Sequence, residues 1–281
     1  MRQVAVTGLH KAFGAHPVLA GVDLEVPAGS LTAILGPSGS GKTTLLRLMA
    51  GFERADAGTI GIGDILVDGP GVYLAPERRR VGYVPQEGSL FPHLTVAANV
   101  GFGLPARRHG ARQRRAGTTA VLVTHDQDEA LSTADRVAAL RDGKIAQCAP
   151  PEDLYRRPAD AELARFIGAA NLLEGVLDGD DVKTLFGALP LDPAATTLGP
   201  AGRVTVLIRP EQIDLGPNEA GLTGRVTSYG YHGHDAVLHV QPADDADARP
   251  ILVRVTGGPH LPVGSPVTLR ARGPVFAWRT D

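Results

Sequence analysis

The residues with the clearest chemical meaning form one short glycine-rich run. They follow the pattern G-x-x-x-x-G-K-[S/T], and they are Gly36, Pro37, Ser38, Gly39, Ser40, Gly41, Lys42, Thr43 and Thr44. Glycine lets backbone N–H groups close around phosphate oxygens, and a helix N-terminus adds partial positive charge. We therefore expect Lys42 to reach the β- and γ-phosphates of a nucleotide, and the Thr43 hydroxyl to ligate Mg²⁺.

The sequence on either side of this run predicts the elements that a phosphate loop needs. Residues 31–35 are a short apolar run with strand character, and residues 43–50 read as a helix. The helix offers Leu45, Leu46, Leu48 and Met49 for burial. A loop between a strand and a helix is the context that makes the motif credible.

Hydrolysis of a bound nucleotide would need a carboxylate for the metal and a group that orients the attacking water. After the loop, the sequence has no apolar strand that ends directly in Asp or Asp-Glu. The nearest match is the apolar run 120–123, where Thr124 and His125 intervene before Asp126. We therefore expect this carboxylate to be missing.

Composition narrows the function classes. The chain has 281 residues and a net charge of −2, which gives no global attraction to nucleic acid or anionic lipid. Cys148 is the single cysteine, so no internal disulfide forms, as suits a reducing cytosol. We find neither an N-terminal signal pattern nor a run of about 18 apolar residues, so we expect any membrane role to come through a partner.

Strand and helix signals alternate through the first part of the chain. The predicted strands cover 22–26, 81–84 and 121–123, and the predicted hairpins cover 58–67 and 136–148, the latter turning at Asp142-Gly143. The predicted helices cover 126–134, with Asp126 as N-cap, and 160–167. This alternation indicates an α/β domain.

The pattern changes after Gly168. Short β-type runs broken by Gly, Pro and Asp cover 204–208, 224–226, 236–240, 251–255 and 267–271. Such a series is typical of a small all-β barrel or sandwich. We therefore predict two domains, 1–168 and 169–281.

The order of several motifs resembles one family. Phe13 lies in Lys11-Ala12-Phe13-Gly14, Gln86 ends the run 82–86, and His125 lies in the run 123–130, with the phosphate loop between the first two. In this order the chain resembles the ATP-binding subunits of ABC importers. Within that family it is similar to the ferric-iron, polyamine and small-solute group, which implies a P-loop α/β domain followed by an OB-like TOBE barrel.

The resemblance also implies roles for individual residues. Phe13 would stack on adenine. A Phe taken alone would more often belong to an apolar core, and it is the position of Phe13 before the phosphate loop that favours stacking. Gln86 would contact Mg²⁺ or the attacking water, and His125 would sense the γ-phosphate. The cofactors implied are ATP and Mg²⁺.

The same resemblance implies partners and a location. Two ATPase subunits, as a homodimer or a pair, would bind ATP between them and drive integral-membrane permease subunits, which a solute-binding protein supplies. The chain would then be cytoplasmic and peripheral, held on the inner face of the cell membrane by the permease.

The chain departs from the family between Gln86 and His125. These residues are only 39 positions apart, too few for a helical subdomain, the Leu-Ser-Gly-Gly-Gln signature and a strand ending in Asp-Glu. We interpret this as an internal deletion joined within 106–111. The chain as it stands is then expected to be deficient in hydrolysis.

Alternatives remain beside this interpretation. The chain could be a nucleotide-binding remnant without turnover, or a misfolded deletion product without a transport function. A phosphate-loop kinase or GTPase is disfavoured, because it would leave Gln86, His125 and the β-domain unexplained. The arginine-rich stretch 107–115 has no interleaved aromatic residue, so we expect no nucleic-acid binding.

His232, His234 and His239 could suggest a metal site, because histidine is a common metal ligand. This hypothesis is weaker than the interpretation that these histidines bind no metal. The run Arg209-Pro210-Glu211 resembles a turn of the same family, which implies a structural or regulatory packing role.

Overall fold

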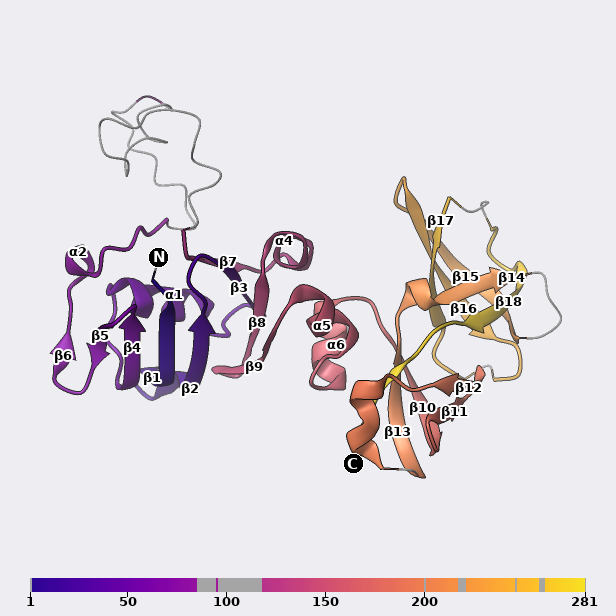
Figure 1. Cartoon of the computed structure of the whole chain (residues 1–281). Coiled ribbons are helices and arrows are strands. Elements are labelled where there is room, and N and C mark those ends of the chain that lie inside the picture. The colour runs from indigo at the N-terminus through magenta and orange to yellow at the C-terminus, as the bar shows by residue number, and fades with distance from the viewer. Residues whose placement is uncertain are drawn as a thin grey trace. The chain divides into compact units, whose positions relative to one another are not determined.

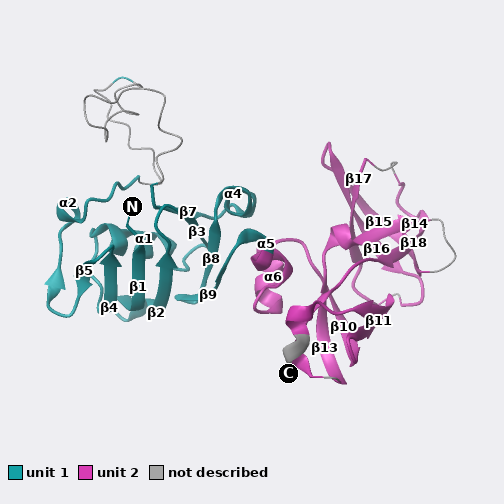
Figure 2. Ribbon diagram, viewed as in Figure 1, with its two compact units in different colours: residues 1–152 teal, residues 153–281 magenta. Residues whose placement is uncertain are grey.

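The computed structural model describes residues 2–84, 95, 118–199, 201–216, 221–245, 247–257 and 261–280. The chain forms two compact units, 1–152 and 153–281, which Figure 2 colours separately. Each unit has its own apolar core, so each is described by itself.

The first unit contains two sheets (Figure 1). One is antiparallel, in the order β2-β1-β4-β5-β6, and its strands are β1 (Val4–Phe13), β2 (His16–Val26), β4 (Ala57–Ile62), β5 (Ile65–Gly69) and β6 (Val72–Tyr73). The other has the order β7-β3-β8-β9, and its strands are β3 (Leu31–Leu35), β7 (Ala120–Thr124), β8 (Arg136–Arg141) and β9 (Lys144–Ala149). In this second sheet β3 pairs in parallel with both β7 and β8, whereas β9 is antiparallel to β8.

Helix α1 (Lys42–Ala50) shares a core with strands of both sheets. Its buried Leu45, Leu48 and Met49 belong to the same apolar cluster as Leu9 of β1 and Ile34 of β3. Apolar burial of this kind contributes roughly 1.5–3 kcal/mol for each large side chain. The core therefore fixes the helix that follows the glycine-rich run, as the sequence predicts.

Local signals place the smaller elements. The remaining helices of this unit are α2 (Pro76–Arg79) and α4 (Gln127–Thr133). Asp126 caps α4 by accepting a hydrogen bond from the Glu129 N–H at 3.0 Å, as predicted. The β8–β9 hairpin turns at Asp142 and Gly143, which both have positive φ, as a two-residue primed turn requires.

The predicted strand at 81–84 is wrong. These four residues form no strand in the structure, and the Val84 side chain is 86% exposed. The Tyr83 ring instead packs edge-on against Phe52, with centroids 5.0 Å apart. Strand propensity needs a pairing partner to be realised, and among the described residues nothing pairs with this segment.

The second unit is almost entirely β, as predicted. One antiparallel sheet has the order β12-β11-β10-β13-β19, with β10 (Asn171–Asp178), β11 (Asp181–Thr184), β12 (Gly187–Pro190), β13 (Ala201–Ile208) and β19 (Phe276–Arg279). The other has the order β14-β18-β15-β16-β17, with β14 (Ile213–Gly216), β15 (Leu222–Tyr231), β16 (Asp235–Pro242), β17 (Ile251–Thr256) and β18 (Pro266–Ala271). Side chains from both sheets form one core.

Two helices precede these strands, α5 (Pro151–Arg156) and α6 (Ala161–Ile167), and two 3₁₀ turns lie at Pro193–Leu198 and Pro210–Gln212. Asp160 caps α6 by accepting a hydrogen bond from the Leu163 N–H at 2.7 Å. The domain boundary predicted between 168 and 169 remains a prediction.

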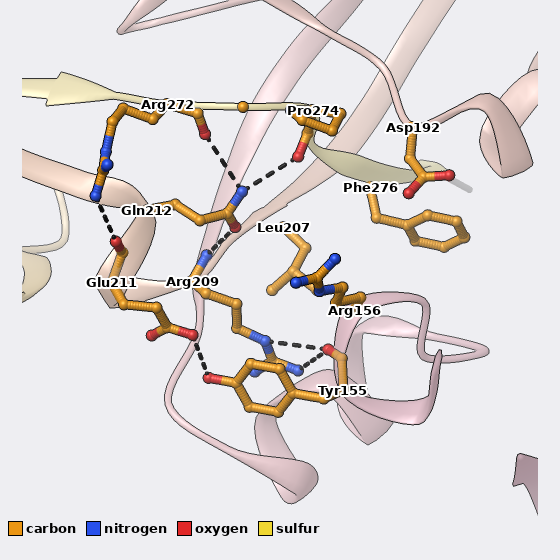
Figure 3. A pocket seen from close by; sticks show the side chains of 11 residues that line it. Tyr155, Arg156, Asp192, Leu207, Arg209, Glu211, Gln212, Arg272, Pro274 and Phe276 are labelled. Atoms are coloured by element: carbon orange, nitrogen blue, oxygen red, sulfur yellow. Dashed lines mark hydrogen bonds between the residues drawn. The ribbon is translucent and has the colours of Figure 1, made fainter. Parts of the chain in front are cut away.

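A buried arginine, Arg209, joins α5 and α6 to the β-strands of the second unit. Figure 3 shows its hydrogen bonds to the Tyr155 backbone. Arg209 is only 3% exposed, and its guanidinium donates hydrogen bonds to the carbonyl oxygens of Tyr155, Ala164, Gly168 and Ala169. These acceptors lie in and after the two helices, where a cation is favourable beside unsatisfied carbonyls. The packing role expected for the Arg-Pro-Glu run is thus visible in its contacts.

The Tyr155 ring lies against the same guanidinium, 3.9 Å from the carbon of that group to the ring centroid. The Tyr155 hydroxyl donates to Glu211 Oε1 at 2.8 Å. Burial, and then the hydrogen bond to the Glu211 carboxylate, raise the pKa of Tyr155 to about 12.

Replacing Arg209 by Met should strongly destabilise the second unit, because several buried carbonyl oxygens would lose their donor. Each such loss costs about 1–3 kcal/mol, so we expect a fall of at least about 3 kcal/mol in the free energy of unfolding. Trp278 is the single tryptophan and lies in this unit, so its fluorescence during urea unfolding is the measurement. The matched control is Arg203→Met, at an exposed position of β13, the strand that ends just before Arg209. Equal effects of both substitutions would contradict the assignment.

The raised pKa of Tyr155 predicts that the stability of the second unit depends on pH. The folded unit holds this proton more tightly than the unfolded chain does, so the stabilisation is complete below pH 10 and is lost as the pH rises towards about 12. Between pH 9 and 12, the free energy of unfolding, measured in urea by the fluorescence of Trp278, should therefore fall more steeply for the wild-type chain than for Tyr155→Phe. Parallel pH profiles for the two proteins would refute this origin.

Candidate functional site

The glycine-rich run turns sharply from the end of β3 into α1, and two of its glycines are required by close packing. A Cβ at Gly36 would lie 2.4 Å from the Leu140 carbonyl oxygen of β8. Gly41 caps α1 with φ of 101°, and a Cβ there would lie 2.9 Å from the Val18 carbonyl oxygen of β2. The loop therefore lies directly against the backbones of two other strands, which fixes its shape.

Lys42 folds back over this loop. Its Nζ donates to the carbonyl oxygens of Gly36 and Pro37, both at 2.8 Å. Burial lowers the pKa of the Lys42 ammonium, because partial desolvation penalises the charged form. The cation is thus held inside the loop by weak neutral acceptors, which an anionic ligand can replace.

Two further features of the loop suit a phosphate group. The Ser40 hydroxyl is buried and has no hydrogen-bond partner within the described part of the chain. The first backbone N–H groups of α1 have no partner inside the helix, as in every α-helix, and they start at this loop. The residues present therefore fit the phosphates of a nucleotide.

Thr43 lies exposed in the first turn of α1, and Thr44 beside it is half-buried. An exposed hydroxyl next to a phosphate-binding loop is suited to ligate Mg²⁺. Gln86, the other predicted metal contact, lies outside the described residues. The structure therefore does not test whether these two side chains meet.

His125 lies at the same edge of the sheet as the loop. In the parallel pairing of β3 with β7, Leu35 is opposite Thr124, so Gly36 and His125 are the next residues of their strands. The His125 side chain is exposed, and the following turn is held by Asp126, whose N–H donates to Thr124 Oγ1 at 3.0 Å. The structure thus brings the predicted histidine and the phosphate loop to one sheet edge.

Phe13 lies on the other sheet, at the tip of the β1–β2 hairpin, where it pairs with His16. The ring is 47% exposed, so it is no core residue. β2 runs from this tip to Val18 and Leu19, which contact the phosphate loop at Gly41. The hairpin therefore links the exposed ring to the loop through one continuous strand.

The sequence did not indicate Arg79, which holds the far end of the phosphate-loop helix. Its guanidinium is buried and donates to the carbonyl oxygens of Leu48 and Met49 at 2.6 and 3.2 Å. Asp68 Oδ2 lies 3.7 Å away. Arg79 is the middle of three consecutive arginines, a run that reads as exposed, so no sequence signal identified it.

Other candidate sites have less support. Within the described ranges, no group of three or more His, Cys, Asp and Glu side chains is placed to hold a metal ion, and His232 and His234 are exposed. A cavity of about 330 Å³ in the second unit is lined by Arg209, Glu211 and Gln212 among others (Figure 3). These polar groups already bond to Tyr155 or to backbone atoms, so they serve the fold.

No helix within the described residues is long and apolar enough to cross a membrane.

Comparison with known proteins supports these features. Residues 19–148 match the ABC transporter family, and residues 206–273 match the TOBE domain. The chain is 37% identical to an Fe(3+) ions import ATP-binding protein of Rhodococcus jostii, over 97% of this chain and 98% of that protein. A protein of the same name from Pseudomonas fluorescens is 35% identical, over 97% of each chain.

The first of these alignments is longer than the chain itself. It spans 343 positions, and the chain has 281 residues, so at least 62 positions contain no residue of this chain. Because both ends of the relative are covered, much of this difference lies inside the chain. With the phosphate-loop unit, the all-β unit and the near-complete match to these relatives, the chain belongs to the ATP-binding subunits of ABC importers.

Proposed function

We propose that this chain binds ATP with Mg²⁺ at residues 36–44, as the nucleotide-binding subunit of an importer. The observation that carries the proposal is the loop between β3 and α1, in which Gly36 and Gly41 approach other backbones closely and Lys42 and Ser40 offer polar groups to an anion. The names of the relatives support Fe(3+) as the transported solute, and a polyamine or another small solute is the alternative.

Each predicted residue then has one role. Lys42 and the start of α1 hold the phosphates, and Phe13 stacks on the adenine ring. Thr43 and Gln86 ligate Mg²⁺, which neutralises phosphate charge when bound. His125, at the edge of the sheet beside the loop, contacts the terminal phosphate.

The partners follow from membership in the importer family. A second ATPase subunit pairs with this chain, and both act on integral-membrane permease subunits that a solute-binding protein supplies. The chain is then cytoplasmic and is held at the inner face of the cell membrane by the permease.

We further propose that the chain as it stands binds ATP but hydrolyses it poorly. Between Gln86 and His125 the sequence lacks the signature and the strand ending in Asp-Glu. The unmatched alignment positions support an internal deletion, as does the failure of 81–84 to form a strand. Within the described residues, β7 pairs only with β3, so its other edge has no strand partner there. The alternative is a non-hydrolysing nucleotide-binding remnant, or a misfolded deletion product, without a transport function.

Lys42→Ala should abolish the rise in thermal stability that Mg²⁺-ATP gives the first unit, because a ligand that binds only the native state stabilises it. For the wild-type chain, a ligand concentration of 100 times the Kd gives about 2.7 kcal/mol. Differential scanning calorimetry with and without Mg²⁺-ATP is the measurement, and Lys144→Ala is the matched control at an exposed lysine. A stabilisation by ATP that survives Lys42→Ala would place the nucleotide elsewhere.

Phosphate release by the purified chain should be far below the usual enzyme range of about 1–10³ s⁻¹. Loss of a general base alone typically costs about 10²–10⁴-fold, and the metal carboxylate is missing too. Inserting the corresponding segment of a relative within 106–111 should restore turnover that depends on Lys42. Turnover in the usual range by the unaltered chain, lost in Lys42→Ala, would show that the deletion is not disabling.

A further inference from the structure

The tip of the β1–β2 hairpin is tied to the turn that follows α1. Asp56 in this turn accepts a hydrogen bond from the Ala12 N–H at 2.7 Å through Oδ2, and its own N–H donates to the His10 carbonyl at 3.0 Å. The Ala12 hydrogen bond, and the nearby Lys11 ammonium, hold the pKa of Asp56 below its usual value. One carboxylate therefore fixes the last residues of β1 to the end of the phosphate-loop helix.

Lys11 lies between this carboxylate and the Phe13 ring. Its Nζ contacts Asp56 Oδ1 at 3.2 Å and the Arg54 carbonyl oxygen at 2.9 Å, and it lies 5.3 Å from the centroid of the Phe13 ring. The Lys11 side chain is 13% exposed, whereas Phe13 is 47% exposed. The ammonium is thus held in place behind a ring that is otherwise open to solvent.

A fixed cation on one face of an aromatic ring has two consequences. It restricts the ring, because the cation is attracted to the ring face. It also draws π-electron density towards itself, which makes the opposite face a better platform for an electron-rich purine. A ring that served only the core would need neither exposure nor a positioned cation.

We propose that Lys11 and Asp56 are positioning residues that hold Phe13 as a stacking platform for the base of the bound nucleotide. The inference rests on the proposed function, since it presumes that the phosphates occupy residues 36–44. It adds a physical link between the two subsites, which runs from the phosphate loop through α1 to Asp56, and from Asp56 to the hairpin tip. The base and the phosphates then bind to two parts of the first unit that Asp56 and α1 hold in a fixed relation to each other.

The test compares ATP with inorganic tripolyphosphate, which has the phosphates but no base. Isothermal titration calorimetry on the full chain with Mg²⁺ gives both affinities. Phe13→Ala should weaken ATP binding about fivefold to a hundredfold, as the loss of base stacking does elsewhere. Lys11→Met and Asp56→Asn should weaken it about twofold to fivefold. None of the three should change the affinity for tripolyphosphate.

Two controls separate positioning from general stability. Lys11→Arg keeps a cation at the ring and should retain most of the ATP affinity. Lys183→Met removes an exposed lysine of the second unit and should change nothing. In a Phe13→Ala background, Lys11→Met should have no further effect on ATP, because there is no ring left to position.

Each contrary outcome is distinct. Equal losses for ATP and tripolyphosphate in Lys11→Met would show a role in the fold or the phosphate loop, which overturns the positioning role. Unchanged ATP affinity in both Lys11→Met and Asp56→Asn would overturn it as well. Equal affinities of the wild-type chain for the two ligands would remove the base platform but keep the phosphate site. Binding of neither ligand would overturn the proposed function together with this inference.

Discussion

The phosphate loop keeps its shape because it is pressed against the backbones of neighbouring strands. Gly36 lies against the Leu140 carbonyl of β8, and Gly41 lies against Val18 of β2. These two contacts come from different sheets, so the loop is fixed only when both sheets and α1 are assembled. Any side chain at either glycine would push apart elements that the core holds together.

The same dependence explains how the proposed site is assembled. Parallel pairing of β3 with β7 brings His125 to the edge of the sheet where the loop begins. The β1–β2 hairpin brings Phe13 and Lys11 from the other sheet, and Asp56 and Arg79 brace the far end of α1. No single element contains the site, which is a product of the packed unit.

Much of this arrangement could be predicted from the sequence because its signals are local. The phosphate loop, the Asp126 cap and the Asp142-Gly143 turn each depend on the chemistry of a few adjacent residues. Local sequence could not show that residues 81–84 form no strand, because a strand forms only beside a pairing strand that lies elsewhere in the chain.

Buried cations were the other feature that the sequence could not reveal. Arg79 and Arg209 look like surface residues by type, yet both are almost fully buried and donate to backbone carbonyl oxygens at helix ends. The sequence indicates only weakly that Lys11 lies beside Phe13. It precedes Phe13 by two positions in one strand, so the two side chains share a face of that strand. Nothing in the sequence indicates the role of Asp56, because its partners Lys11 and Ala12 are 45 and 44 positions away along the chain.

Hydrogen–deuterium exchange of the full chain, with and without saturating Mg²⁺-ATP, tests the central claim most directly because it locates the nucleotide on the chain. The account predicts that ATP slows exchange in peptides covering residues 36–49 and in the hairpin tip at 10–16, and leaves the strands of the second unit unchanged. Slower exchange confined to the second unit, or none at residues 36–49 when ATP is saturating, would contradict it.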